Sequence, residues 1–316
     1  MVSLRQWAEH GSGWHGRLPG NAAVYILRVE EEEASLMAMS WRGQILEVRY
    51  GPVRMRISAR SRGCLHQAGA LAAGRRAEQA LDELSSYRSA ALQPRPLLPS
   101  SRGLPRVLSL MIEAVDRAGD PTLTPMAAVA GSIAQVALEA ALSLGASTII
   151  VENGGDIALA VGDGEVVRVG VARSLADRRP THVITVTADS AIAGVCTSGL
   201  GGRSFTRGIA ETTAVAAESP ALADACATVI ANAVYVDDPA ITRRPARELD
   251  PDTDIPTLLV TCHVGDLPPT TLERALSEGT REARKLLAMG AIAGAVVGVS
   301  GNRRIVVPPG FASPLE

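Results

Sequence analysis

Apolar and polar residues alternate with a period of two along residues 22–60, as they do in strands that are buried on one face. The glutamate run Glu30–Glu33 and the pair Arg42–Gly43 interrupt this alternation as turns. The pattern therefore predicts an N-terminal antiparallel meander over residues 22–60, with the glutamates at a solvated hairpin tip. The strands of this meander are expected at Val24–Val29, Ser35–Trp41, Gln44–Tyr50 and Val53–Ser58.

The rest of the chain mixes helical periodicity with short, closely spaced strands. Between residues 147 and 187, four apolar runs follow one another too closely for crossover helices, so we expect them to pair antiparallel. The polar, Pro-rich stretch 237–255 is predicted to be a connection, and a strand is predicted at Thr257–Val264. Helices are predicted over residues 65–88, 105–118, 126–144, 220–234 and 270–289.

These elements predict an α+β fold in which antiparallel sheets pack against helices. We expect a single domain over residues 1–316, because a chain of this length and apolar content can bury one large core. Its expected parts are the meander at 22–60, a core at 125–236 that carries the motifs described below, and a C-terminal strand, helix and hairpin at 256–309.

One predicted helix carries polar residues that its burial does not explain. Ser219 is a good N-cap and Pro220 suits the first helical position. The helix is apolar almost all round, which is typical of a buried helix, yet Asp224, Thr228 and Asn232 lie in one line along it. A buried carboxylate is unfavourable unless it is paired or bound to a cation, and a carboxylate with a hydroxyl suits Mg²⁺. The other interpretation is structural: Asp224 holds a neighbouring loop and Thr228 bonds to its own helix.

Composition and charge exclude several classes of function. The formal net charge is −2 and aromatic residues make up 3% of the chain, so neither a basic footprint nor stacking platforms for nucleic acid are expected. The four cysteines form no Cys-x-x-Cys pair, which predicts reduced thiols and no zinc site. The N-terminal residues lack the apolar core of a signal peptide, and no run approaches the roughly 18 apolar residues of a membrane span. We therefore expect a cytoplasmic protein.

The stretch Glu152-Asn153-Gly154-Gly155-Asp156 follows a strongly apolar run and has two interpretations. Asn-Gly favours the positive backbone dihedrals of a type I′ turn, here at Asn153 and Gly154, which makes the stretch a plain hairpin. The hairpin leaves the second glycine and the two flanking acids unexplained. A backbone without side chains also allows the close approach of a ligand. The residues alone leave both interpretations open.

The segment Cys196–Ser204 combines small hydroxyl residues, glycines and an arginine after a predicted strand. Such a loop could cradle a phosphate or another anion. It matches neither the P-loop nor the Rossmann fingerprint, and Ser198 is not in the Gly-x-Ser-x-Gly context of a hydrolase nucleophile. A surface loop is the more ordinary interpretation of the segment when it is taken alone.

Taken together and in order, these segments resemble the ApbE family, the Mg²⁺-dependent flavin transferases that move FMN from FAD onto a Thr or Ser of a target protein. The likeness includes the Ala-Gly helix at 128–135, the turn at 154–157, Val-Gly-Val at 169–171, Thr-Ser-Gly at 197–199 and Ala-Asp-Ala-Cys-Ala-Thr at 223–228. The stretches 125–131, 152–156 and 249–254 resemble more narrowly an uncharacterised side branch of that family.

The resemblance implies an ApbE-like domain and assigns roles to particular residues. Asp224 and Thr228 would hold Mg²⁺ against a bound pyrophosphate. The flavin nucleotide, FAD or FMN, would lie against Asn153, Gly154, Gly155, Asp156, Thr197, Ser198, Gly199 and Arg203. Its anionic part would meet Thr197, Ser198 and Arg203.

The sequence departs from the family pattern at the catalytic step. True transferases carry a His-x-x-Asp-Pro segment between Thr-Ser-Gly and the metal helix, but Arg203–Val215 contains no histidine. The Lys-Gly of the family is Ala130-Gly131 here. The catalytic residue is therefore unknown.

The first expectation is a Mg²⁺-dependent enzyme that handles a flavin nucleotide or a related phosphorylated ligand, with FMN transfer to a protein as its most concrete form. The alternatives are a flavin or small-molecule binding protein without catalysis, and a hydrolase of a catabolic pathway that uses the same pocket. The expected partners are a small molecule and, for transfer, an acceptor protein, with no nucleic acid and no membrane; a homo-oligomer is left open.

Overall fold

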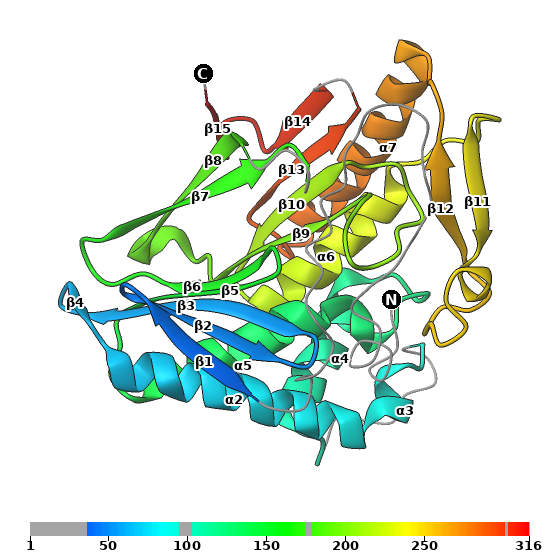
Figure 1. The fold of residues 1–316 in the computed structure, drawn as a ribbon. Coiled ribbons are helices and arrows are strands. Elements are labelled where there is room, and N and C mark those ends of the chain that lie inside the picture. The colour runs from blue at the N-terminus through cyan, green and yellow to red at the C-terminus, as the bar shows by residue number, and fades with distance from the viewer. Residues whose placement is uncertain (1–36, 95–102, 175–178, 301–302, 316) are drawn as a thin grey trace.

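A large antiparallel sheet dominates the structure, which is a computed structural model that describes residues 37–94, 103–174, 179–300 and 303–315. Helices cover one face of this sheet and a smaller antiparallel sheet covers part of the other (Figure 1). This arrangement confirms the predicted α+β class with antiparallel sheets packed against helices. The single-domain organisation over 1–316 stays a prediction, and the expected strand Val24–Val29 and turn Glu30–Glu33 lie outside the described residues.

The strands of the described residues pair antiparallel throughout. The large sheet has the order β1 (Ala38–Arg42), β2 (Ile45–Tyr50), β3 (Val53–Ser61), β5 (Thr148–Asn153), β6 (Asp156–Ala160), β9 (Gly194–Ser198), β10 (Thr212–Ala217), β13 (Gly294–Val299) and β14 (Arg303–Val307), and β4 (Cys64–Leu65) pairs with β3. The smaller sheet contains β15 (Ser313–Pro314), β8 (Pro180–Thr187) and β7 (Val166–Ala172). A separate ribbon contains β11 (Ile241–Pro245) and β12 (Leu259–Val264).

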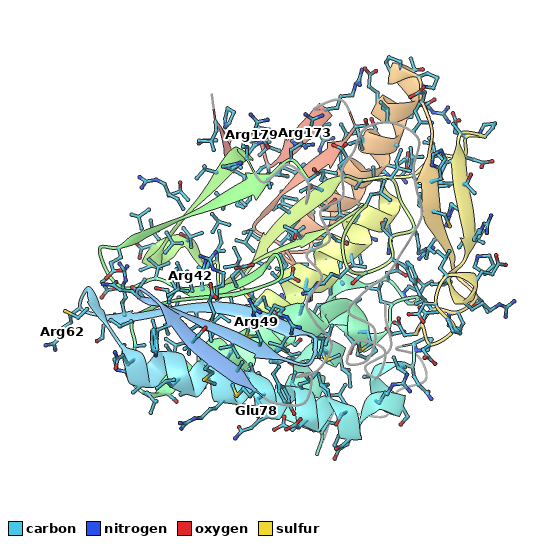
Figure 2. All side chains as sticks on the ribbon, in the orientation of Figure 1. Arg42, Arg49, Arg62, Glu78, Arg173 and Arg179 are labelled. Carbon is cyan, nitrogen blue, oxygen red and sulfur yellow. The ribbon has the colours of Figure 1, made fainter. Side chains whose placement is uncertain are left out.

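The central strands are buried on both faces, and their side chains alternate between two cores because successive residues of a strand point to opposite faces. On β6, Ala158 belongs to the core beneath the helices, whereas Leu159 belongs to the core beneath the smaller sheet. On β9, Cys196 and Val195 divide in the same way. Charged side chains such as Arg42 and Arg62 lie on the outer surface (Figure 2). This two-sided burial explains why these strands read as nearly continuous apolar runs.

The five predicted helices agree with the structure to within three residues at each end, and the short α3 was not predicted. They are α2 (Gln67–Ser86), the short α3 (Arg88–Ala91), α4 (Arg106–Ala118), α5 (Val129–Ser143), α6 (Pro220–Ala233) and α7 (Pro269–Ala288), with the 3₁₀ turns η2 (Pro125–Ala128), η3 (Ala188–Ser190) and η4 (Ala246–Glu248). One stretch, Pro125–Ser143, is long and apolar enough to cross a membrane, contrary to the expectation that no such run exists. It is 61% buried inside the fold, where α5 packs against α2 and α6, so its apolar character is that of a core helix.

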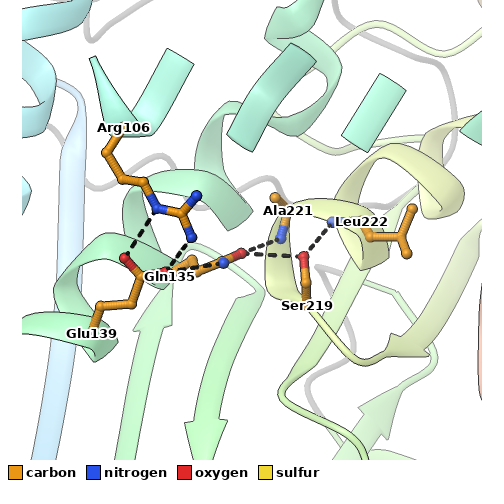
Figure 3. Close-up of polar contacts among 6 residues, drawn as sticks. All are labelled: Arg106, Gln135, Glu139, Ser219, Ala221 and Leu222. Atoms are coloured by element: carbon orange, nitrogen blue, oxygen red, sulfur yellow. Dashed lines mark hydrogen bonds and ion pairs between the residues drawn. The ribbon is translucent and has the colours of Figure 1, made fainter. Parts of the chain in front are cut away.

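The start of α6 is fixed by a polar network that joins three helices (Figure 3). The Ser219 hydroxyl accepts a hydrogen bond from the backbone N–H of Leu222 at 3.2 Å, which confirms the predicted N-cap. The same hydroxyl donates to the Gln135 side chain on α5 at 3.2 Å. Gln135 in turn donates to Glu139, which pairs with Arg106 on α4 at 3.0 Å. The network therefore sets the position of α6 relative to α4 and α5.

Two parts of the architecture differ from the sequence-based expectation. The stretch 237–255 was expected to be a connection, but it contains β11 and η4. Pro245 at the end of β11 is compatible with a strand because the two-stranded ribbon has open edges, where a missing N–H is tolerated. Strand β10 was also not predicted. It consists of Thr, Ala and Val and lies between β9 and β13. Its residues Ala214 and Ala216 are fully buried.

Candidate functional site

A cavity of about 1110 Å³ opens between the β5–β6 turn, the end of β9 and one face of α6. All ten residues that the resemblance singles out line it: Asn153, Gly154, Gly155, Asp156, Thr197, Ser198, Gly199, Arg203, Asp224 and Thr228. These residues come from three separate segments of the chain, so their convergence is a property of the fold. Their roles in binding stay predictions.

The turn between β5 and β6 contains Gly154 and Gly155, one residue later than the sequence indicated. Asn153 pairs with Asp156 across the hairpin, and the positive φ angles belong to Gly154 (67°) and Gly155 (108°). The expected positive dihedral is therefore confirmed at Gly154 and wrong at Asn153, because Asn153 is the last ladder residue of β5. A Cβ at Gly154 would collide with the Arg203 guanidinium, so the bare backbone here admits the arginine.

Asp156 begins β6 and is held at the bottom of the cavity. Its carboxylate accepts a hydrogen bond from the backbone N–H of Thr197 at 3.0 Å, which joins the hairpin to the end of β9. Only 8% of the residue is exposed. Burial raises the pKa of Asp156 to about 6, against the opposing effects of the Thr197 N–H and the positive charge of Arg203.

Asp224 on α6 reaches the same place because α5 and α6 approach closely. Its carboxylate accepts a hydrogen bond from the backbone N–H of Gly131 at 2.9 Å. A Cβ at Gly131 would collide with the carbonyl oxygen of Pro220 and lie 2.9 Å from the Asp224 Cβ, so the contact needs glycine. Burial raises the pKa of Asp224 well above its usual range, and the negative charge of Asp156 raises it further.

The donor atoms at the bottom of the cavity suit a hard cation. Asn153 donates its amide N–H to the carbonyl of Ala130, but its amide oxygen is buried and has no hydrogen-bond partner. Together with the carboxylates of Asp156 and Asp224 and the hydroxyl of Thr228, this oxygen gives a set made of oxygen atoms alone. The described residues contain no group of three or more His, Cys, Asp or Glu that could hold a metal ion.

The mouth of the cavity carries positive charge. Arg203 donates to the carbonyl of Pro52 at 3.2 Å, which places its guanidinium over Gly154 and beside the β2–β3 turn. Arg54 lies nearby on β3, and its pKa is lowered by burial and by the positive charges of Arg49 and Arg203. Two cations that disfavour each other's charge are a favourable site for an anion. Thr197, Ser198 and Gly199 follow the same rim.

The polar residues along α6 contact different segments of the chain. Asp224, Thr228 and Asn232 all line the cavity, and the Asn232 side chain also accepts a hydrogen bond from the backbone N–H of Arg207 at 2.8 Å. Arg207 also donates to the Thr122 hydroxyl at 2.8 Å. Asn232 therefore fixes the loop after β9 against α6. Cys226 on the same helix is fully buried, as expected of a small core residue.

Sequence reasoning missed one further group at the cavity. Asp254 and Thr124 both line it, both are buried, and the Thr124 hydroxyl donates to the Asp254 carboxylate. The segment Leu249–Asp254 was noted for its resemblance, but no role was assigned to it. The two residues are 130 positions apart, so only the fold brings them together.

A family model described as "AbpE bacteria" matches residues 37–305, which is most of the chain. The chain therefore belongs to this family.

Individual relatives and one solved structure are similar over parts of the chain. A UPF0280 protein of Methanospirillum hungatei JF-1 is 35% identical over 147 residues, 46% of this chain and 58% of the relative. A UPF0280 protein of Methanosarcina acetivorans is 40% identical over 138 residues, 43% of this chain and 52% of the relative. The chain thus spans a little over half the length of these relatives. The crystal structure of the Pseudomonas stutzeri flavinyl transferase ApbE in its apo form is 13% identical, with a TM-score of 0.44 over 80% of this chain and 91% of that one.

Proposed function

We propose that this member of the AbpE family binds a flavin nucleotide, FAD or FMN, together with Mg²⁺ in the cavity between the β5–β6 turn and α6. The observation that carries the proposal is the meeting of two buried carboxylates with an arginine-lined rim in one cavity. A bound cation would stabilise the ionised form of the buried carboxylates, and the positive charge of the rim favours an anion. A nucleotide phosphate with Mg²⁺ supplies both.

Within this proposal, Asp224, Asp156, Thr228 and the amide oxygen of Asn153 would hold the metal. Bound Mg²⁺ would neutralise phosphate charge and orient the pyrophosphate. Arg203 would pair with a phosphate oxygen, and the bare backbone at Gly154 leaves room for this side chain. Backbone hydrogen bonds from Gly131 and Ala130 orient the Asp224 carboxylate for the metal.

The second candidate is a flavin-binding protein without transferase activity. The described residues that line the cavity include no histidine, and Arg203–Val215 lacks the histidine segment of true transferases. Transfer of FMN to a hydroxyl needs a group that accepts the hydroxyl proton. We therefore propose nucleotide binding as the function, with FMN transfer onto a protein as the reaction that family resemblance implies.

Calorimetric titration of the purified chain with FAD, with and without Mg²⁺, tests the proposal. FAD should bind at least about tenfold more tightly with the metal. Asp224→Asn should abolish this difference, because the amide retains the bond to Gly131 N–H but loses the charge. Asp163→Asn, an equal change of charge in an exposed loop, is the matched control and should bind as the parent does. Equal FAD affinity with and without Mg²⁺ would contradict the metal assignment.

Transfer is tested separately by incubating the chain with FAD, Mg²⁺ and an acceptor peptide that a typical transferase modifies. We expect little or no mass increase of the peptide by one FMN. Robust transfer would show that another residue serves as the base, and it would rule out the second candidate.

A further inference from the structure

The segment Leu249–Asp254 contributes a buried carboxylate to the cavity that the proposed metal and phosphate contacts do not use. Asp254 is 7% exposed and lines the cavity. One of its carboxylate oxygens accepts a hydrogen bond from the Thr124 hydroxyl, while the other is buried without a partner. A buried acceptor without a donor is costly, so a ligand N–H at this oxygen would be favourable.

The walls around this carboxylate are apolar. Leu123 precedes Thr124 and is buried, and Ile255 and Leu258 continue the chain after Asp254. A hydrogen bond from the backbone N–H of Leu258 to the carbonyl of Ile255 folds these two residues into a turn. All three line the cavity. A slot with aliphatic walls and one fixed acceptor fits a flat ring that carries an N–H, and it fits a phosphate poorly.

We propose that Asp254 is a specificity-determining residue that accepts a hydrogen bond from an N–H group on the heteroaromatic ring of the bound nucleotide. This inference rests on the proposed function, because it assumes that the phosphates of the same ligand lie at the Arg203 rim. Thr124 holds the carboxylate in place, and the apolar residues around it cover the faces of the ring. In FAD both the flavin and the adenine carry such an N–H donor.

A neighbouring residue offers a matched control. Asp250 is also 7% exposed, lies in the same segment and has a buried carboxylate oxygen without a partner. Its other oxygen accepts a hydrogen bond from the backbone N–H of Asp252, which makes it a turn residue. Asp250 is not among the residues that line the cavity. Replacing Asp250 therefore removes a similar buried acid that does not line the cavity, although its negative charge acts on Asp254.

The test is titration of the parent, Asp254→Ala, Asp254→Asn and Asp250→Ala with FAD, FMN and ADP in the presence of Mg²⁺. Asp254→Ala should weaken FAD binding at least about tenfold, because the buried ring N–H would be left without an acceptor. Asp254→Asn should keep most of the affinity, because its amide oxygen still accepts while its NH₂ group donates to Thr124. Asp250→Ala should bind FAD within about twofold of the parent.

The two half-ligands identify the ring. A loss for FMN but not ADP assigns the flavin to Asp254, and a loss for ADP but not FMN assigns the adenine. Equal losses of affinity for FMN and ADP would place the effect at the shared phosphates and overturn the proposal. Unchanged FAD binding by Asp254→Ala would also overturn it, because that result is expected if only water contacts this carboxylate. An Asn variant as weak as the Ala variant would mean that charge is needed, and it would overturn the assignment of a neutral N–H donor.

The outcomes also separate this inference from the proposed function. A parent that binds none of the three probes would overturn the proposed function and the inference with it. A parent that binds FAD normally while Asp254→Ala does the same would overturn the inference alone. If Asp254→Ala does not fold, Leu258→Trp takes its place, because a large side chain at this half-buried wall should fill the slot and weaken FAD binding at least about tenfold. Unchanged FAD binding by that variant would count against the ring site.

Discussion

Replacement of Asp156 by Asn should make the ligand-free protein more stable at neutral pH while removing its function. The carboxylate is buried beside Asp224, and its pKa rises from 3.8 to about 6 mainly because of burial. Below pH 4 the carboxyl is protonated in both the folded and the unfolded chain, so burial costs little there. Between pH 4 and 6 the folded state binds more protons than the unfolded state, and stability falls as the pH rises.

The size of this effect follows from the pKa shift. A rise of about two units corresponds to about 3 kcal/mol of lost stability, fully present above pH 6. Asn carries no charge, and its amide oxygen can still accept the hydrogen bond from Thr197 N–H. The free energy of unfolding of Asp156→Asn should therefore match that of the parent near pH 4 and exceed it by up to about 3 kcal/mol at pH 7. The variant also removes the negative charge of Asp156, which raises the pKa of Asp224.

Urea unfolding from pH 4 to pH 8, followed by circular dichroism without metal or nucleotide, measures this difference. Asp163→Asn controls for the change of net charge, because Asp163 is exposed, and its curve should follow that of the parent. With Mg²⁺ and FAD the order should reverse, since binding stabilises only the parent. If the free energies of unfolding of the parent and Asp156→Asn differed by the same amount at every pH, the argument that burial of this charge is costly would be refuted.

Three further variants test other contacts. Gly155→Ala should destabilise the ligand-free chain by roughly 1–3 kcal/mol, because its φ is 108° and the new Cβ would lie 2.9 Å from the Thr197 hydroxyl. The control Gly145→Ala has a φ of 90° but open space around the new Cβ, so it should cost less. Equal melting temperatures of the two variants would exclude an effect of the Thr197 contact. Ser219→Ala should cost about 1 kcal/mol or more in denaturant unfolding, because both the cap and the Gln135 bond are lost; an unchanged midpoint would contradict this role. Arg203→Gln should weaken FAD binding and make the affinity depend less on salt concentration. If the affinities of the parent and the variant depended equally on salt, Arg203 would not contact the phosphate.

Local patterns were sufficient for most of the fold. The 3.6-residue periodicity placed α2, α4 and α7, and the close spacing of apolar runs after residue 147 required antiparallel pairing. These features depend on neighbours in sequence, so one chain reveals them. Strand β10 could not be recognised in the same way, because Thr-Thr-Ala-Val-Ala-Ala is apolar without alternation and is compatible with a helix or a strand. Its pairing with β9 and β13 decides between them.

The site was predictable only where a motif marked it. The glycines of the β5–β6 turn and the acid of α6 stand out in the sequence, and they meet in one cavity. The turn itself was misplaced by one residue, because Asn-Gly and Gly-Gly both favour positive dihedrals and only the strand register chooses between them. The Thr124–Asp254 pair has no local pattern at all, since its hydrogen bond joins the residue before η2 to a loop after η4.

The polar row on α6 shows why helical periodicity is a limited guide to function. Steps of four place Asp224, Thr228 and Asn232 on one face, and a single face suggests a single purpose. The loop after β9 crosses that face, so Asn232 meets the backbone of Arg207 while Asp224 meets the N–H of Gly131. Each partner comes from a different segment, and each satisfies a buried polar group. The structural interpretation explains Asn232 by the loop that it holds. Asp224 differs, because its pKa stays raised even with backbone hydrogen bonds from Gly131 and Ala130, which do not offset burial beside Asp156. Metal binding by Asp224 therefore stays a prediction that the structural interpretation does not replace.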